Sequence, residues 1–406
     1  SSLIRNLGPD SQTDAVLTIT GGVYRGGINN VKNDEMGILT ISDGTFENAS
    51  QAAVLNWDNM TISGGTFTAP IALLSGFYAE NSGDGVNIIE GGTFNGTIEG
   101  FIVEDGDYTY AEKATYTITG GNFANAVASA YTLEQMKVFL AAGINVYLPR
   151  ELTVTGEQEI DLNGLTVTAA GVGFVVSGEA NHLVIRDGVG TGSLTGGSGG
   201  DYNAIRIMYG GKVDIYGGTY SVGPDANGFG NATIYVTTGN GICNIYGGTF
   251  MTEAAYNGFW YVLNVGQTQG AEGYMNVFGG TYVNYNPATG DDNLGGNFVE
   301  DGYGVVVSQD EDNTIYTVLP VEGSDVVFDA SNSASLDSLV KAGAKNIRIG
   351  ADMTLDKTIA MTKGDITLDL NGKTVTFDGA GIIDLSNAAQ LTVTGNGKMD
   401  NLMTSD

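Results

Sequence analysis

One short phrase recurs eight times along this chain and constrains its fold more than any other feature. The phrase is an apolar residue, a spacer, Ile or Val, another spacer, usually a Gly pair, and an aromatic residue two positions after the second Gly. The second Gly and the aromatic of the copies are Gly22 and Tyr24, Gly44 and Phe46, Gly65 and Phe67, Gly92 and Phe94, Gly121 and Phe123, Gly218 and Tyr220, Gly248 and Phe250, and Gly280 and Tyr282. Such self-similarity predicts a solenoid, in which one structural unit is stacked on the next.

Within the phrase, the residue pattern predicts a strand followed by a corner. Leu17 to Thr20 alternate apolar and polar side chains, which is the period of a strand with one inward face. The second Gly never varies and the first is Asp43 in one copy, so we expect a corner with a left-handed backbone and more tolerance at the first position. The copies are too irregularly spaced for hairpins, and a parallel coil with turns about 4.8 Å apart fits them.

A parallel coil would place equivalent residues of successive turns in two inward rows. The expected rows are Ile19, Ile41, Ile62, Ile89, Ile118, Ile215, Ile245 and Val277, and Tyr24, Phe46, Phe67, Phe94, Phe123, Tyr220, Phe250 and Tyr282. Each buried member would contribute about 1.5–3 kcal/mol. Asn87 stands where other copies carry an apolar residue or Tyr, which fits either the end of a buried amide row or a local bulge.

The charge of the chain limits its partners. It has 16 basic and 46 acidic residues among 406, a formal charge of −30, which opposes binding to nucleic acid or to anionic membranes. No apolar run reaches the length of about 18 residues that a membrane span needs, so we expect no membrane insertion. The one cysteine, Cys243, falls at an inward position and should be a small buried hydrophobe. Its use fits a reducing compartment and equally a surface protein built without disulfides.

Two helices interrupt the repeated phrase. Thr132 and Gln135 form a capping box ahead of apolar residues on one helical face, which predicts a helix over about 132–142 that ends at Gly143. The segment 335–342 repeats the start, the apolar spacing and the terminating Gly. The sequence therefore predicts a larger period with a capping helix in each unit.

This larger period divides the chain into three parts. We predict the C-terminal part of one unit at 1–130, a complete unit at 131–320 and the N-terminal part of a third at 321–406. The complete unit should close with strands at 303–307 and 314–318, and 101–103 with 108–110 should close the first in the same way. Because the chain starts with Ser1 and open stacks expose their core, we expect a longer parent protein.

At this point the chain resembles a known family. The strands Ile160–Gly164 and Leu368–Gly372, each following a predicted helix, and the Gly-Gly-Thr-Phe segments at 64–67, 91–94 and 247–250 look like right-handed, pectate-lyase-like parallel β-helix repeats of bacterial cell-surface and adhesin-type proteins. The likeness covers nearly the whole chain. It implies an all-β, right-handed parallel β-helix and an extracellular location, at the bacterial surface or secreted. The architecture carries lyases, hydrolases, tailspikes and structural stalks alike.

The set of residues that catalysis by a β-helix enzyme would need is incomplete in this chain. Hydrolases that the chain resembles carry paired Asp, Gly-His-Gly and Arg-Ile-Lys, whereas His182 has no flanking Gly and Arg206 is followed by Ile-Met. Arg186 and Asp187 with Arg206 and Asp214 could form a lyase-like site on neighbouring turns. Opposite charges on adjacent strands are more often structural pairs, so we predict a noncatalytic protein.

The candidate binding surface is an outward aromatic stripe. Tyr216, Tyr246 and Phe278 each precede a Gly pair, and at about 4.8 Å per turn their rings could stack on sugars. Asp214, Asn244 and Asn276 accompany them outward and could hydrogen-bond sugar hydroxyls. The alternative is that loops cover the stripe or that it only shields the backbone.

A weak calcium site is the one cofactor that the sequence suggests. Asp310 and Asp312, and likewise Asp291 to Asn293, place oxygen ligands close together without the glycine spacing of a known calcium loop. An acidic hairpin tip is the alternative at Asp310 and Asp312.

Together these features predict a noncatalytic extracellular segment that acts as a rigid stalk or adhesion module and engages cell-surface or host glycans or proteins. A polysaccharide lyase or glycoside hydrolase, and a virion fibre or tailspike, are the alternatives. The oligomeric state stays open.

Overall fold

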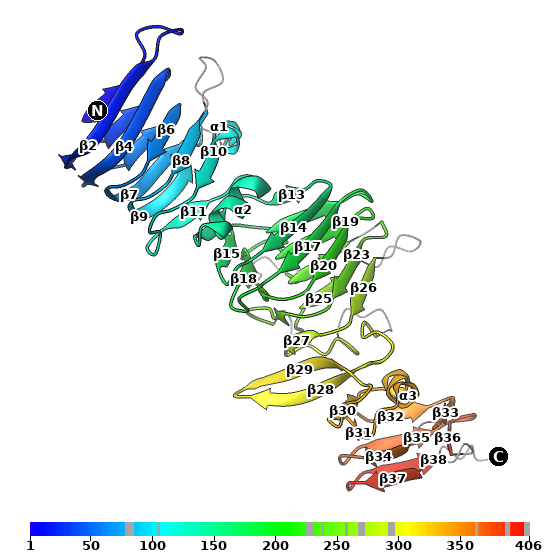
Figure 1. Ribbon diagram of the computed structural model, residues 1–406. Coiled ribbons are helices and arrows are strands. Elements are labelled where there is room, and N and C mark those ends of the chain that lie inside the picture. Colours follow the sequence, from blue (N-terminus) through cyan, green and yellow to red (C-terminus); the bar gives the residue numbers. More distant parts are fainter. Residues whose placement is uncertain are drawn as a thin grey trace. The chain divides into compact units, whose positions relative to one another are not determined.

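A computed structural model describes residues 1–77, 85–103, 106–224, 231–237, 239–255, 259–266, 273–290, 297–361, 364–385 and 390–401. The fold is all-β, with 51% of residues in strands and 7% in helices. Parallel strands stack into a β-solenoid of about 14 turns, which confirms the predicted architecture (Figure 1). The chain forms two compact units, the first with Ser1–Thr153, Ile160–Gly173 and Asp187–Leu194, the second with Val154–Glu159, Phe174–Arg186 and Thr195–Asp406. The predicted boundaries at 130 and 320 stay a prediction.

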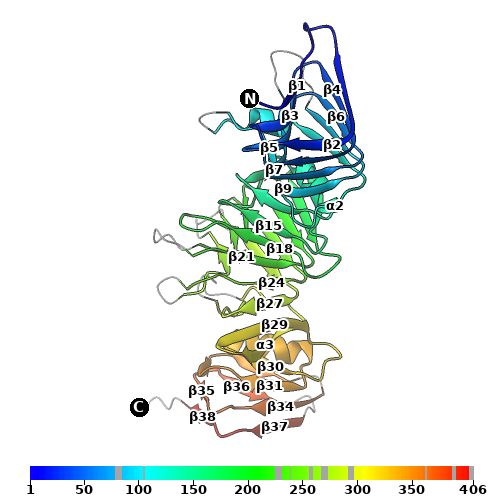
Figure 2. The same cartoon turned by 90° about the vertical axis from the view of Figure 1, so that its left-hand side faces the viewer.

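The first unit holds the first five copies of the phrase. Its strands are β1 (Ile4–Asn6), β2 (Ala15–Arg25), β3 (Asn29–Asn33), β4 (Gly37–Glu47), β5 (Ala52–Asn56), β6 (Asn59–Ile62), β7 (Thr66–Ser75), β8 (Val86–Ile89), β9 (Thr93–Gly100), β10 (Thr115–Ile118), β11 (Val127–Ser129), β12 (Asn145–Leu148) and β15 (Thr166–Ala169). Figure 2 shows β2, β7 and β9 as layers of this stack. Both predicted rows are in register: Ile19 lies opposite Ile41, and Tyr24 opposite Phe46. Their side chains fill the interior of the coil, as the alternation predicted.

The inward aromatic row is a column of stacked rings. From Tyr24 through Phe46, Phe67 and Phe94 to Phe123, neighbouring ring centroids are 4.8–5.0 Å apart and the planes are within 17° of parallel. Tyr occurs in this row because its hydroxyl reaches the corner: Tyr24 donates to the carbonyl of Gly21 at 3.0 Å. Tyr and Phe are therefore interchangeable there, since both fill the same space.

A buried asparagine row runs along another corner of the first unit. The Nδ2 of Asn6 donates to Oδ1 of Asn33 at 2.8 Å, Asn33 to Asn56 at 2.8 Å, and Asn56 to Asn87 at 3.0 Å. Asn87 in turn donates to the hydroxyl of Ser75 at 2.8 Å. The open question about Asn87 is thus answered, because it ends a buried amide row.

The second unit repeats the arrangement with the last three copies. Its strands are β16 (Phe174–Ser177), β17 (His182–Arg186), β19 (Ile205–Met208), β20 (Lys212–Ile215), β21 (Thr219–Val222), β22 (Ile234–Val236), β23 (Ile242–Ile245), β24 (Thr249–Phe250), β25 (Leu263–Val265), β26 (Tyr274–Val277), β27 (Gly280–Val283), β28 (Tyr303–Asp310), β29 (Asn313–Pro320), β30 (Val327–Ala330), β31 (Asn346–Ile349), β32 (Met353–Leu355), β33 (Thr358–Ala360), β34 (Asp365–Asp369), β35 (Thr374–Phe377), β36 (Ile382–Asp384), β37 (Gln390–Thr394) and β38 (Lys398–Asn401). The strands β13 (Leu152–Val154), β14 (Glu157–Asp161) and β18 (Ser193–Gly196) give residues to both units. Cys243 is buried between Val213 and Met275 of the adjacent strands, as predicted.

The glycines of the phrase have two different physical reasons. The second Gly has a φ between 93° and 134° in all eight copies, a conformation that favours glycine. The first Gly is required by close approach in later copies, because a Cβ on Gly91 would collide with the backbone carbonyl of Ser63 in the turn before, whereas a Cβ on Gly21 in the first copy would meet no atom within 4 Å. The expected tolerance at the first position is therefore wrong as a general rule. Asp43 is accommodated where the register between β2 and β4 shifts.

Of the three helices among the described residues, two were predicted. Helix α2 (Leu133–Ala141) has Thr132 as its N-cap, whose side chain accepts from the backbone N–H of Gln135 at 3.2 Å. Helix α3 (Ser333–Ala342) starts two residues before the predicted position, because Asn332 and Ser335 form its capping box. The third, α1 (Thr109–Lys113), replaces the closing strand that was predicted at 108–110. That prediction was wrong because the Tyr-Thr-Tyr sequence resembles a strand while Ala111 packs into the core.

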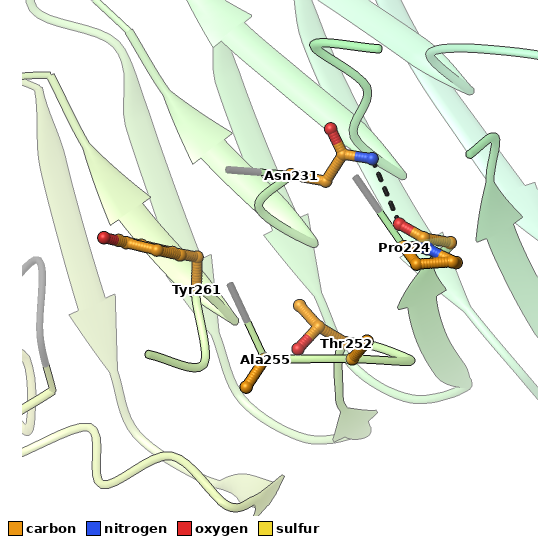
Figure 3. Close-up of a pocket in the computed structure, with 7 residues that line it drawn as sticks. Pro224, Asn231, Thr252, Ala255 and Tyr261 are labelled. Carbon is orange, nitrogen blue, oxygen red and sulfur yellow. Dashed lines mark hydrogen bonds between the residues drawn. The ribbon is translucent and has the colours of Figure 1, made fainter. Parts of the chain in front are cut away.

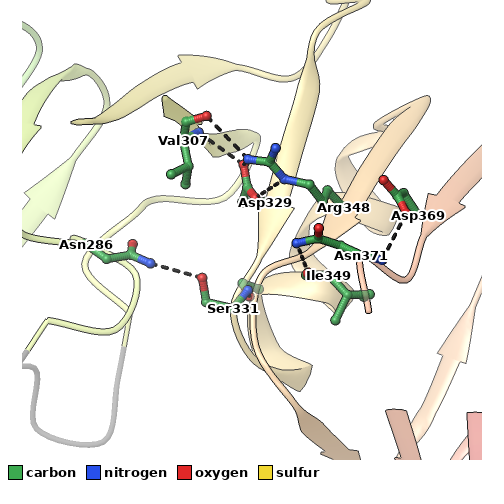
Figure 4. A network of polar contacts seen from close by, with 9 residues as sticks. Asn286, Val307, Asp329, Ser331, Arg348, Ile349, Asp369 and Asn371 are labelled. Atoms are coloured by element: carbon green, nitrogen blue, oxygen red, sulfur yellow. Dashed lines mark hydrogen bonds and ion pairs between the residues drawn. The ribbon is translucent and has the colours of Figure 1, made fainter. Parts of the chain in front are cut away.

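Antiparallel pairing appears where β27 meets a hairpin. β29 pairs with β27 and with β28, both antiparallel, so the two strands predicted at 303–307 and 314–318 are present. Figure 4 shows how the hairpin joins the next strands: Arg348 pairs with Asp329 at 2.7 Å and 2.9 Å. The same two side chains bond the backbone of Val307, whose N–H donates to Asp329 at 3.0 Å and whose carbonyl accepts from Arg348 at 3.3 Å. The ion pair thus satisfies the backbone N–H and carbonyl of Val307, which a neighbouring strand would otherwise bond.

Candidate functional site

The predicted aromatic stripe lies at the C-terminal ends of β20, β23 and β26 in the second unit. Tyr216, Tyr246 and Phe278 directly follow these strands, and Tyr216 and Tyr246 are 43% and 41% exposed. The rings of Tyr216 and Tyr246 are 4.7 Å apart and within 10° of parallel, and those of Tyr246 and Phe278 are 4.9 Å apart and within 9°. The stripe is therefore a stacked column, which we call the outer aromatic column.

Stacking determines what this column can offer a ligand. The guanidinium of Arg186 lies 4.3 Å from the ring centroid of Tyr216, and Tyr303 meets Phe278 edge-on at 5.7 Å. Tyr246 has an aromatic ring on each face, so a sugar ring has no free face of Tyr246 on which to stack. A ligand would meet ring edges and phenol hydroxyls, which act as hydrogen-bond donors and acceptors.

The polar companions of the column lie in a row that is largely buried. Asp214 and Asn244 are only 7% and 9% exposed, which corrects the expectation that they stand open beside the rings. Asn276 donates to Asn244 at 2.8 Å, and Asn244 donates to Asp214 at 2.6 Å. The two amides and the carboxylate thus form a chain of hydrogen bonds along the solenoid, as the asparagines of the first unit do.

Two side chains that the sequence analysis did not connect with this row contact the carboxylate of Asp214. His182 Nε2 lies 2.9 Å and Lys212 Nζ 3.1 Å from the same carboxylate oxygen. Burial by itself would raise the pKa of Asp214, but hydrogen bonds from Asn244, Lys212 and His182 hold it below its ordinary value of 3.8. His182 and Lys212 are direct register partners on β17 and β20. The parallel register of the two strands could therefore have predicted that these side chains lie next to each other.

The phenol of Tyr246 is held in its protonated form. Partial burial raises the pKa of Tyr246, and the charge of Asp214 adds to that shift. Tyr246 can therefore donate a hydrogen bond through its hydroxyl at neutral pH.

The residues considered for catalysis do not converge on one place. Arg186 pairs with Glu159 at 2.6 Å on the outer face of β17. Arg206 lies on β19, in a different sheet, and bonds the side chain of Asn203 at 2.8 Å. Asp187 accepts from the backbone N–H of Gly164 at 2.8 Å and of Gly192 at 2.6 Å. Each of them has a structural partner.

The candidate calcium ligands lie at the tip of the β28–β29 hairpin. Asp310 is the last residue of β28 and pairs with Asn313, and Asp310 and Asp312 are both exposed. Among the described residues, no three His, Cys, Asp or Glu side chains gather as a metal site would require. A calcium site at Asp310 and Asp312 stays a prediction, and Asp291 to Asn293 lie outside the described residues.

One small cavity in the second unit has a polar lining. Figure 3 shows it between Asn231, Thr252 and Tyr261, with a volume of about 40 Å³. The hydroxyl of Thr252 is buried and has no hydrogen-bond partner among the described residues. The cavity can hold about one to three water molecules, so it suits bound solvent rather than an organic ligand.

Comparison with protein-family models, with curated proteins and with solved structures gave no match. Among the described residues, no helix is long and apolar enough to cross a membrane.

Proposed function

We propose that this protein is a noncatalytic extracellular module of a bacterial surface protein, which serves as a stiff stalk or adhesion segment. The observation that carries the proposal is the continuity of the side-chain rows. In the first unit five rings stack without a break, beside an amide row that bonds Asn6 through to Asn87. Bending such a unit would separate stacked rings and buried amides, which opposes flexing.

The charge and the cysteine are both compatible with an extracellular setting. A formal charge of −30 keeps a chain soluble and repels it from anionic membranes. The one cysteine is buried, as suits a surface protein that does not depend on disulfides.

Stiffness within a unit can be measured with spin labels. Thr18 and Thr117 are exposed and belong to one row of register partners, four turns apart. With Cys243 replaced by Ala and cysteines introduced at these two positions, attached spin labels should give a narrow distance distribution. Its centre should be at about 19 Å, four times the strand spacing. A broad distribution would contradict the stalk.

The absence of catalysis can be tested directly. The four candidate residues hold loops and strands together, which supports a noncatalytic role. Incubation with a panel of acidic polysaccharides should release neither new reducing ends nor unsaturated sugars. Release of either product would establish a lyase or a hydrolase and refute the proposal.

Adhesion would use the outer aromatic column through its edges and hydroxyls. We expect cell-surface or host glycans as partners, and a glycan array is the assay. The double substitution Tyr216→Ala, Tyr246→Ala should abolish binding, whereas Tyr274→Ala, at an exposed tyrosine of another row, should preserve it. Equal binding by the double variant, or no binding by the unaltered protein, would contradict adhesion through this column and leave only the stalk role.

A further inference from the structure

Tyr216 and Tyr246 form an exposed pair of stacked phenols on adjacent turns. Their centroids are 4.7 Å apart and their planes differ by 10°, so the two rings are stacked. The other tyrosines of the stacked rows differ in this respect: Tyr24 stacks on Phe46, and Tyr220 and Tyr282 both stack on Phe250. Two oxidisable rings thus face each other at a place that solvent reaches.

We propose that Tyr216 and Tyr246 are the site of an oxidative cross-link, a dityrosine that joins two successive turns of the solenoid. The reagent is a one-electron oxidant of phenols, such as a peroxidase supplied with hydrogen peroxide. The inference does not depend on glycan binding or on the stalk role.

The chemistry balances as follows. Each phenol loses one electron and its hydroxyl proton, which gives two phenoxyl radicals, and one hydrogen peroxide is reduced to two water molecules. The radicals form one carbon–carbon bond between the ring carbons next to the hydroxyls. The hydrogens on those two carbons then move to the oxygens, which restores both phenols.

The surroundings of the pair direct the coupling to these two residues. Exposure of 43% and 41% lets the oxidant reach the ring edges. Phe278 covers the far face of Tyr246, and Arg186 covers the far face of Tyr216. Neither forms a phenoxyl radical, so the two groups that flank the pair offer no third ring for coupling. Coupling inside the chain also outpaces coupling between chains, because the partner ring is already in place.

The bond would add a covalent tie between strands that are otherwise held by hydrogen bonds. It links residues 30 positions apart, from 216 to 246, and so restricts the unfolded chain more than the folded one. We therefore expect the cross-linked protein to unfold at a higher urea concentration than the untreated protein.

The test is peroxidase and limiting hydrogen peroxide on the intact protein, followed by proteolysis and mass spectrometry. We expect dityrosine fluorescence in chains that stay monomeric on a denaturing gel, and a peptide pair joined at 216 and 246 that has lost two hydrogens. Tyr216→Phe and Tyr246→Phe should each abolish that peptide pair and keep the stack, since Phe278 already occupies this column.

Tyr274→Phe is the matched control, because Tyr274 is 53% exposed and its register partner is Ile242. It should leave the yield unchanged. Absence of the 216–246 peptide pair from the treated protein would overturn the proposal, and so would dityrosine that joins only separate chains. An unchanged yield of dityrosine in Tyr246→Phe would also overturn the proposal.

Discussion

Replacing Asn33 by Ala removes the centre of the buried asparagine row and tests how much that row stabilises the first unit. Asn33 is 0% exposed. The two N–H groups of its Nδ2 are shared among three acceptors, on Gly37, Asn56 and Asn59, and its Oδ1 accepts from Asn6. The bonds of both N–H groups and of Oδ1 disappear, and alanine adds no apolar packing that would offset them.

The expected loss follows from the two N–H groups and the one acceptor that lose their bonds. At about 1 kcal/mol for each, the free energy of unfolding should fall by about 3 kcal/mol. The matched control is Asn125→Ala, because Asn125 donates to Asn95 on the preceding turn at 3.1 Å in an exposed pair. That exposed bond should contribute less than about 0.5 kcal/mol.

The assay is equilibrium urea unfolding followed by tryptophan fluorescence. The chain has two tryptophans, and with Trp260 replaced by Phe the signal comes from Trp57, whose backbone N–H donates to the carbonyl of Asn33 at 2.8 Å. A loss below about 1 kcal/mol for Asn33→Ala, comparable to that of the control, would refute the idea that the amide row is a main stabilising element.

Three further changes test other parts of the structure. Gly91→Ala should destabilise the first unit by about 1–3 kcal/mol in urea unfolding, because the new Cβ meets the carbonyl of Ser63. Arg348→Met should cost the second unit about 3–5 kcal/mol by thermal or urea unfolding, because Asp329 is 4% exposed and would keep its charge with no cation beside it, only the backbone N–H of Val307. Asp214 has a lowered pKa, so its stabilising contribution is present above pH 3.8 and is lost as pH falls through the folded value; Asp214→Asn should flatten the acid side of a stability–pH profile.

Each of these changes has its own contrary result. Gly350→Ala, where a Cβ would meet ordinary van der Waals contacts, is the control for the glycine, and an equal loss for both would contradict steric exclusion at Gly91. For Arg348→Met, a loss below about 1 kcal/mol would show that Asp329 is satisfied without the ion pair. An acid profile for Asp214→Asn that matches the unaltered protein would show that other carboxylates dominate.

The repeated phrase was enough to predict the architecture. The alternation of Leu17 to Thr20 and the fixed second Gly describe a strand and a corner, and this physics is local. Stacking the copies then set the register, because a slip by one residue would turn Ile19 to the solvent. Both inward rows follow from that constraint.

What the sequence left open depends on contacts outside the phrase. The amide row needed Asn6, Asn33 and Asn56, which lie in no copy of the phrase and meet Asn87 only through the coil. Likewise, Asp214 stands at an outward position, yet it is buried in its row and paired with Lys212 and His182. Alternation predicts the direction of a side chain, whereas its neighbours on adjacent turns decide its exposure.

Disulfide trapping across adjacent turns tests the stacking of the copies most directly. Thr18 lies opposite Thr40 on the next turn. With Cys243 replaced by Ala, cysteines at these two positions should form a disulfide, because strands about 4.8 Å apart bring their Cα atoms within disulfide range. Cysteines at Thr18 and Ser42, two residues out of register, should not. Equal or faster bond formation in the second pair would contradict the proposed register and the solenoid that depends on it.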